Sequence, residues 1–105
     1  MTLEDLRKIE LYQTAAIGEA AADPDTLRYI FECLDRFYSG DFGEVPAEDS
    51  DLNIQELESG EGHCLGRYKP KFKLLGDIYI NSYFSEENPD DLDYNNTLVM
   101  YCNEY

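Results

Sequence analysis

The spacing of apolar residues changes near residue 60 of this chain, and that change constrains the fold more than any other sequence feature. Asp23-Pro24 predicts the start of a helix that runs to about Tyr38, with Asp as the N-cap and Pro at the first helical position. Pro46 predicts a second, shorter helix that runs to about Ser59 and is closed by Gly60. Beyond Gly60 the pattern is typical of strands.

Three strand segments are expected in that second part, namely Cys64 to Tyr68, Asp77 to Phe84 and Thr97 to Cys102. On the first helix, helical spacing predicts one buried face that consists of Leu27, Ile30, Phe31, Leu34 and Phe37 or Tyr38. The first dozen residues are ambiguous. Thr2 and Asp5 resemble a weak N-cap pair, whereas residues 9–13 alternate like a strand.

The order of these segments predicts the fold class. One possible strand, two helices and three consecutive strands with short connections favour an α+β fold. We expect an antiparallel sheet of three to four strands with two helices packed on one face. The chain has 105 residues, so one hydrophobic core and a single domain over residues 1–105 are expected.

The charge of the chain restricts its partners. The formal net charge is −15, from 23 acidic and 8 basic residues. Nucleic acid and anionic membranes are therefore poor direct partners, because both repel a protein of this charge. There is no apolar run of about 18 residues and no charged-then-apolar leader, so a cytoplasmic protein is expected.

The sequence contains no complete catalytic or metal-binding motif, and we expect neither an enzyme nor a cofactor. His63 and Cys64 are neighbours, but adjacent residues on a strand point to opposite faces and cannot act as base and nucleophile. The segment that starts at Asp49 resembles a calcium loop, yet Ile54 and Gly60 stand where the loop needs Gly and Glu. A magnesium site made of acidic pairs remains an alternative interpretation. The three cysteines are widely spaced and suit buried, reduced thiols.

Half of the basic residues lie in one short segment, at Arg67, Lys69, Lys71 and Lys73. One interpretation is that this segment is a solvated strand face and turn, or that its lysines guard a sheet edge. The other is that it forms salt bridges with the acidic surface.

The acidic residues gather in two blocks, which are the candidate partner-binding residues. The first block surrounds the second helix and contains Asp41, Glu44, Glu48, Asp49, Asp51, Glu56, Glu58 and Glu61. The second lies in an acidic loop over residues 85–96 and contains Glu86, Glu87, Asp90, Asp91 and Asp93. Either block alone is usual for a solvated surface, but the two together suggest a binding role.

The size of the chain allows this charge to be compared with that of DNA. A domain of 105 residues has an expected radius of gyration of about 13 Å and hence a diameter of about 33 Å. Duplex DNA of that length carries about 20 phosphate charges. The net charge of the protein is of the same order, which permits DNA mimicry.

From Leu34 onward the chain resembles a family of small proteins carried on plasmids, integrated conjugative elements and prophages, often labelled plasmid-related. The residues that carry the resemblance are Ser39-Gly40-Asp41-Phe42-Gly43, Glu48-Asp49, Asn53, Leu57, Gly60, Arg67-Tyr68, Asp77-Ile78-Tyr79-Ile80 and Glu104-Tyr105. The match covers about two-thirds of the chain. Phe42 stands where the family usually has Trp, and the short turn before the last strand is replaced by the acidic loop.

A setting on mobile elements, together with the added acid, implies an inhibitor of host defence. By size and charge the chain also resembles small acidic anti-CRISPR and anti-restriction proteins. The expected partner is a basic nucleic-acid-binding protein, most readily a CRISPR-Cas effector such as Cas9, bound by a monomer or a small homo-oligomer. The alternative is an accessory protein-binding module of a plasmid or prophage, in which the Tyr-rich sheet face or the Gly40 to Gly43 turn contacts the partner.

Overall fold

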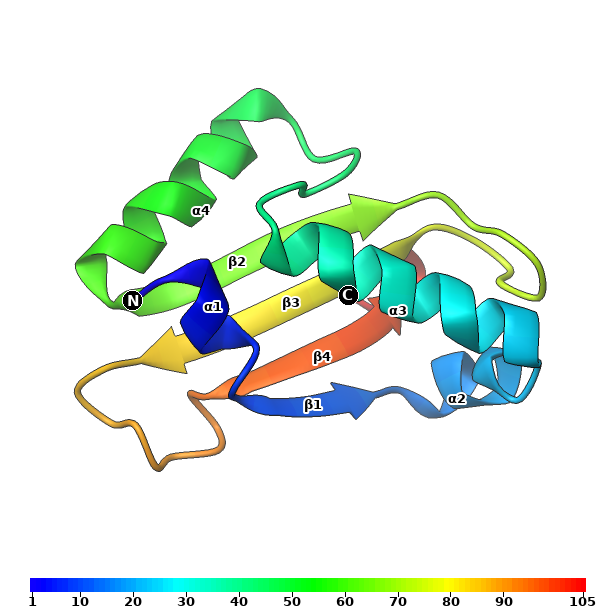
Figure 1. The fold of residues 1–105 in the computed structure, drawn as a ribbon, viewed down its shortest axis with the longest axis horizontal. Helices are drawn as coiled ribbons and strands as arrows, with labels where there is room; N and C mark the ends of the chain where they lie inside the picture. The colour runs from blue at the N-terminus through cyan, green and yellow to red at the C-terminus, as the bar shows by residue number, and fades with distance from the viewer.

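A computed structural model describes all 105 residues and confirms the α+β class (Figure 1). The elements are α1 (Leu3–Leu6), β1 (Glu10–Gln13), α2 (Ala15–Ala21), α3 (Pro24–Tyr38), α4 (Ala47–Ser59), β2 (Glu61–Tyr68), β3 (Ile78–Ser85), β4 (Asn96–Tyr101) and a final 3-10 turn (Cys102–Glu104). They form one four-stranded sheet with strand order β1-β4-β3-β2. Strands β2, β3 and β4 form the expected antiparallel meander, and β1 adds a parallel pair with β4.

Both patterns in the first dozen residues, the N-cap pair and the alternating segment, form structure. Thr2 and Asp5 form a capping box that starts α1, and hydrogen bonds from Thr2 lower the pKa of Asp5. The alternating segment that follows becomes β1. It runs parallel to β4. Parallel strands need a long connection between them, and here helices α2 and α3 return the chain across the sheet before the meander begins. The ambiguity in the sequence therefore reflects two very short elements.

Helix α3 covers one face of the sheet (Figure 1). The Asp23 side chain accepts the Thr26 N–H at 3.0 Å, as expected of an N-cap, and the pKa of Asp23 is lowered by hydrogen bonds from Thr26. Its buried face includes Ile30, Leu34 and Phe37, as predicted. The prediction was wrong for Leu27 and Phe31, which are exposed because they lie on the side of α3 that overhangs the short edge strand β1.

Helix α4 lies beside β2 and protects the open edge of that strand. The Asn53 side chain donates to the Leu65 carbonyl and accepts the Leu65 N–H, each at 3.0 Å. The Glu56 carboxylate accepts the His63 N–H at 2.8 Å. Side chains of a helix thus take the place of a fifth strand, and the edge cannot pair with another chain.

The rest of this edge is closed by the segment between α3 and α4. The Phe42 carbonyl accepts the Arg67 N–H at 3.0 Å, and the Glu44 N–H donates to the Arg67 carbonyl at 2.7 Å. Phe42 is buried in the core. Gly43 has a φ of 70° and lies directly against the Arg67 backbone. The Gly40 to Gly43 turn is therefore part of the scaffold.

Replacing Gly43 with alanine is expected to lower the free energy of unfolding by about 3 kcal/mol or more. The added Cβ would lie 2.0 Å from the Arg67 carbonyl oxygen, and the backbone angle also disfavours a side chain. Urea unfolding measures the loss. Gly76→Ala is the control, since no atom lies within 4 Å of a Cβ at that position, and equal stability of the two variants would contradict the close contact.

The two faces of the sheet differ in what covers them. Ile78, Ile80 and Phe84 of β3 belong to the hydrophobic core beneath the helices. The opposite face carries Tyr79, Asn81 and Tyr83, no α-helix packs over it, and the C-terminal Tyr105 lies edge-on against Tyr79 with ring centroids 5.4 Å apart. No helix of this chain combines the length and the apolar character that crossing a membrane requires.

Candidate protein-interaction surfaces

The two acidic blocks, which are far apart in the sequence, meet at one end of the sheet. Glu61 pairs with Ser85 across β2 and β3, and the Glu86 N–H donates to the Gly60 carbonyl at 2.9 Å. The last turn of α4 therefore lies against the start of the acidic loop, on the left of Figure 1. We call this region the acidic end, and it comprises Glu58, Glu61, Glu86, Glu87, Asp90, Asp91 and Asp93.

The first block continues from the acidic end along the edge of the sheet. Helix α4 carries Glu48, Asp49 and Asp51 on its first turns, and Glu44 lies just before it. Because α4 runs beside β2, these carboxylates follow the protected edge of the sheet toward its other end (Figure 1). The acidic end and these four residues together form the acidic face.

Four of the predicted site residues have partners within the chain, and one of them is Asp91, which accepts the Asp93 N–H at 3.0 Å. Asp41 accepts from Arg36 Nε at 2.7 Å and from the Gly43 N–H at 3.0 Å, and these bonds lower its pKa. Glu56 caps the β2 edge, as described above. Glu86 forms an ion pair with the amino group of Met1. Asp41 and Glu56 stabilise the scaffold, as the Gly-Asp-Phe-Gly turn indicates for a capping Asp41 and as no sequence pattern indicates for Glu56.

The other predicted carboxylates form no ion pair within the chain. In the acidic end, Glu58, Glu61, Glu87, Asp90 and Asp93 are all exposed. Their charge is therefore not neutralised internally and is available to a basic partner.

The acidic loop is held in shape by one buried side chain. Asn95 accepts the Ser85 N–H at 3.2 Å and donates to the carbonyls of Asn88 and Asp91. Asn96 adds a bond to the Leu92 carbonyl at 2.8 Å. Asn95 was missed in the sequence, because an Asn in a polar loop gives no signal. Its bonds present the loop carboxylates in a defined arrangement.

The basic segment lies away from the acidic end. Arg67 pairs with Asp77 at 2.8 Å, and Lys71 lies over the ring of Tyr29 at 5.1 Å from its centroid. Residues 69–73 belong to the connection between β2 and β3, at the opposite end of the sheet (Figure 1). The interpretation that this segment neutralises the acidic surface is therefore wrong, because its one ion pair lies within its own hairpin.

The uncovered sheet face is the second candidate surface. Its centre is Asn81, which pairs with Leu65 on β2 and Leu98 on β4 and lies between Tyr79 and Tyr83 on its own strand. Asn81 is 0% exposed, yet neither its amide nitrogen nor its oxygen has a hydrogen-bond partner. A buried amide without partners within the chain is costly for a fold.

Replacing Asn81 with leucine is expected to raise the free energy of unfolding by about 1–2 kcal/mol. The change removes a buried donor and acceptor that no group satisfies, and leucine has the same branching and number of side-chain heavy atoms as asparagine. Urea unfolding of Asn53→Leu supplies the contrast, since the same change there removes two made hydrogen bonds and lowers stability. A marked loss of stability in Asn81→Leu would contradict the absence of a partner.

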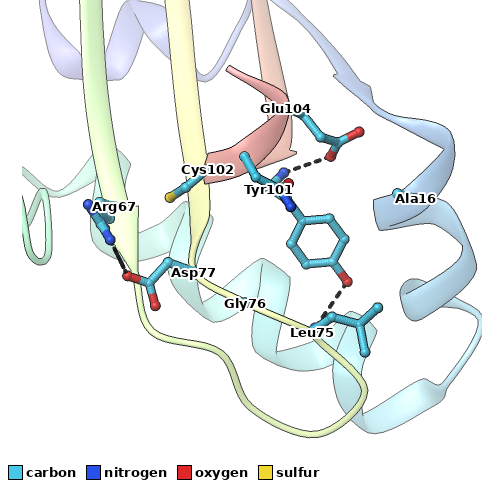
Figure 2. Close-up of a pocket in the computed structure, with 9 residues that line it drawn as sticks. Ala16, Arg67, Leu75, Gly76, Asp77, Tyr101, Cys102 and Glu104 are labelled. Atoms are coloured by element: carbon cyan, nitrogen blue, oxygen red, sulfur yellow. Dashed lines mark hydrogen bonds and ion pairs between the residues drawn. The ribbon is translucent and has the colours of Figure 1, made fainter.

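The largest cavity, of about 600 Å³, lies beneath the final 3-10 turn, at the end of the sheet opposite the acidic end (Figure 2). Its polar groups are occupied by one another. Arg67 binds Asp77, the Tyr101 hydroxyl accepts the Leu75 N–H at 3.2 Å, and Glu104 accepts the Tyr101 N–H at 2.8 Å. Burial raises the pKa of the Cys102 thiol at its wall. The Cys102 thiol is therefore not activated as a nucleophile.

His63 and Cys64 lie on opposite faces of β2, as predicted. The His63 ring stacks on Tyr83 with a centroid separation of 5.3 Å, on the uncovered face. Cys64 is buried in the core, where burial raises the pKa of its thiol to about 12. The two side chains cannot act as a pair.

Comparisons with known proteins add no relative. No protein-family model matches this chain, and neither a curated protein nor a solved structure matches it. The resemblance to plasmid-related proteins therefore stays a prediction. No group of three or more His, Cys, Asp or Glu side chains is arranged to hold a metal ion.

Proposed function

We propose that this chain is an anti-defence protein of a mobile element that acts in the bacterial cytoplasm as an anti-CRISPR inhibitor. It binds a CRISPR-Cas effector such as Cas9 through the acidic face and blocks the groove that holds nucleic acid. It does this as a binding protein, without catalysis and without a cofactor. The observation that carries the proposal is the meeting of two separate acidic blocks at one end of the sheet.

The density of charge supports a groove made for nucleic acid. Helix α4 has 13 residues and is about 20 Å long. Duplex DNA of that length carries about 12 phosphates. Helix α4 carries five carboxylates over this length, and the acidic loop adds five more beyond its C-terminal end. A channel lined with Arg and Lys therefore meets negative charge of the same order along this surface.

The manner in which effectors hold their duplex also favours this target. A guide–target heteroduplex is recognised through its backbone and shape in a positively charged channel, and not through its base sequence. Carboxylates on a rigid scaffold satisfy such a channel without bases. The Asn95 bonds and the α4 contacts with β2 hold the acidic face before binding, which lowers the entropy lost in the complex.

Nuclease inhibition tests the proposal. Purified Cas9-type and cascade-type effectors, loaded with guide RNA, are mixed with increasing amounts of the protein, and cleavage of target DNA is measured. We expect cleavage to fall when the protein is added before the DNA and to fall much less when it is added afterwards. Undiminished cleavage by every effector at a large excess of the protein would contradict the proposal.

A second candidate function rests on the uncovered sheet face. The exposed ring of Tyr83, stacked on His63, favours an accessory module that binds its partner through this face. On that account, neutralising the acidic loop leaves partner binding intact, whereas Tyr79→Ala and Tyr83→Ala abolish it. The proposed inhibitor gives the opposite pattern.

A further inference from the structure

An apolar groove lies between β1 and α3, at the edge of the sheet opposite β2 and α4. Its walls include Leu11, Leu27, Phe31 and Val99, and its volume is about 190 Å³. Phe31 is 53% exposed, although the helical pattern predicts it in the core. No charged side chain lines the groove.

The backbone of β1 is open along this groove. The Thr14 N–H, one residue beyond β1, donates to the Val99 carbonyl at 3.1 Å. Because alternate residues of a parallel strand bond to their neighbour, Tyr12 faces β4, and the N–H and C=O groups of Leu11 and Gln13 point away from it. All four residues of β1 are exposed.

The two edges of the sheet therefore differ in whether their backbone hydrogen-bonding groups are covered. The β2 edge is closed by Asn53, Glu56 and the Phe42 to Glu44 segment. The β1 edge has no such cover and is bordered by exposed apolar side chains. Open edges with apolar borders are sites at which another strand adds to a sheet.

We propose that β1 pairs antiparallel with β1 of a second copy of this chain, across a twofold axis, to form one continuous eight-stranded sheet. A twofold contact uses the same surface on both copies, so β1 and its groove supply both halves of the interface. Leu11 to Gln13 carry no charge, which matches the uncharged groove that receives them.

The distribution of charge favours this occupant. The strand order places β1 and β2 at opposite edges, and α4 with its carboxylates lies beside β2. A dimer joined at β1 therefore holds the carboxylates of the two α4 helices at its outer edges, where repulsion between them is smallest. A contact at the β2 edge would bring the two α4 helices together.

The register follows from the same residues. The outward backbone N–H and C=O groups of Leu11 form hydrogen bonds with those of Gln13 in the partner copy. Tyr12 then lies opposite Tyr12 of the partner copy as a non-hydrogen-bonded pair. Aromatic residues are favourable at such directly opposed positions. Glu10 then faces Thr14, so the like charges of the two Glu10 side chains are not opposed.

Sedimentation velocity of the whole chain tests the proposal. We expect a monomer–dimer equilibrium whose dimer fraction rises with protein concentration and with salt, because salt screens the repulsion between copies. Phe31→Asp should weaken dimerisation at least tenfold. Leu52→Asp is the matched control, since Leu52 is 51% exposed on α4, far from β1, and it should leave the equilibrium unchanged.

A covalent test fixes the register. Tyr12→Cys, made with Cys102→Ser, should form a disulfide-linked dimer on mild oxidation, because Cα atoms of opposed non-hydrogen-bonded residues lie about 4.5 Å apart. A chain that stays monomeric up to about 1 mM overturns the proposal. So does a dimer that Phe31→Asp leaves intact, or a monomer that binds only an unrelated extended peptide. Failure here leaves nuclease inhibition untouched, since the acidic face is not involved.

Discussion

Replacing Asn53 with alanine is expected to lower the free energy of unfolding by about 2–4 kcal/mol. Asn53 is buried on α4, and its amide makes both hydrogen bonds of the Leu65 backbone at the sheet edge. Truncation leaves a donor and an acceptor without partners and also reduces the contact between α4 and β2. Urea unfolding measures the change, and hydrogen exchange of the Leu65 amide is expected to accelerate.

The control for this prediction is Gln55→Ala on the exposed side of the same helix. Both changes improve helix propensity slightly, so their difference isolates the bonds to Leu65. If both variants were equally stable, α4 would not depend on Asn53 for its position. The acidic face would then lack the fixed support on which the proposed function relies.

Neutralising the acidic end is expected to weaken effector binding about 100-fold or more at low salt. The variant carries Glu58→Gln, Glu61→Gln, Glu87→Gln, Asp90→Asn and Asp93→Asn, all at exposed positions without ion pairs. Close charge pairs in complexes of this kind contribute from about 1.5 kcal/mol each, and about 1.4 kcal/mol is a factor of ten in affinity. Titration calorimetry or biolayer interferometry gives the dissociation constant.

A control variant with the same net charge separates position from total charge. It carries Glu4→Gln, Glu19→Gln, Asp25→Asn, Glu32→Gln and Asp35→Asn, which lie on α1, α2 and α3 and not on the acidic face. We expect this control to lose less than tenfold in affinity. Equal losses in the two variants would mean that overall charge drives binding, without a defined acidic surface.

Much of the fold could be predicted from local signals. The Asp23-Pro24 start of α3 and the Gly60 end of α4 depend on capping and backbone angles that are encoded within a few residues. The meander from β2 to β4 follows from strands with short connections. The parallel pairing of β1 with β4 joins segments about 86 residues apart, and no local pattern specifies such a contact.

The burial of α3 shows where periodicity is insufficient. Leu27 and Phe31 have the same spacing as Ile30 and Leu34, so a helical pattern cannot separate them. Burial depends on how far the sheet extends beneath the helix, and β1 is short and lies at the edge. An exposed apolar face of this kind is visible only in three dimensions.

The candidate site was predicted in composition but not in detail. Acidic residues could be recognised as two blocks, whereas their meeting depends on the β2–β3 register. The capping role of Asp41 is local and follows from the Gly-Asp-Phe-Gly turn, whereas the bond from the His63 N–H to Glu56 depends on how α4 packs beside β2 and has no signal in the sequence. Asn81 and Asn95 were missed for the same reason, since the roles of buried amides depend on their neighbours.

The most direct measurement of the central claim is the affinity of this protein for a guide-loaded Cas9-type or cascade-type effector as a function of salt, with guide–target duplex as competitor. The account predicts binding that weakens at least tenfold between about 50 and 200 mM salt and that the duplex displaces. Binding that is indifferent to salt and compatible with bound duplex, or no binding to any effector at low salt, would contradict it.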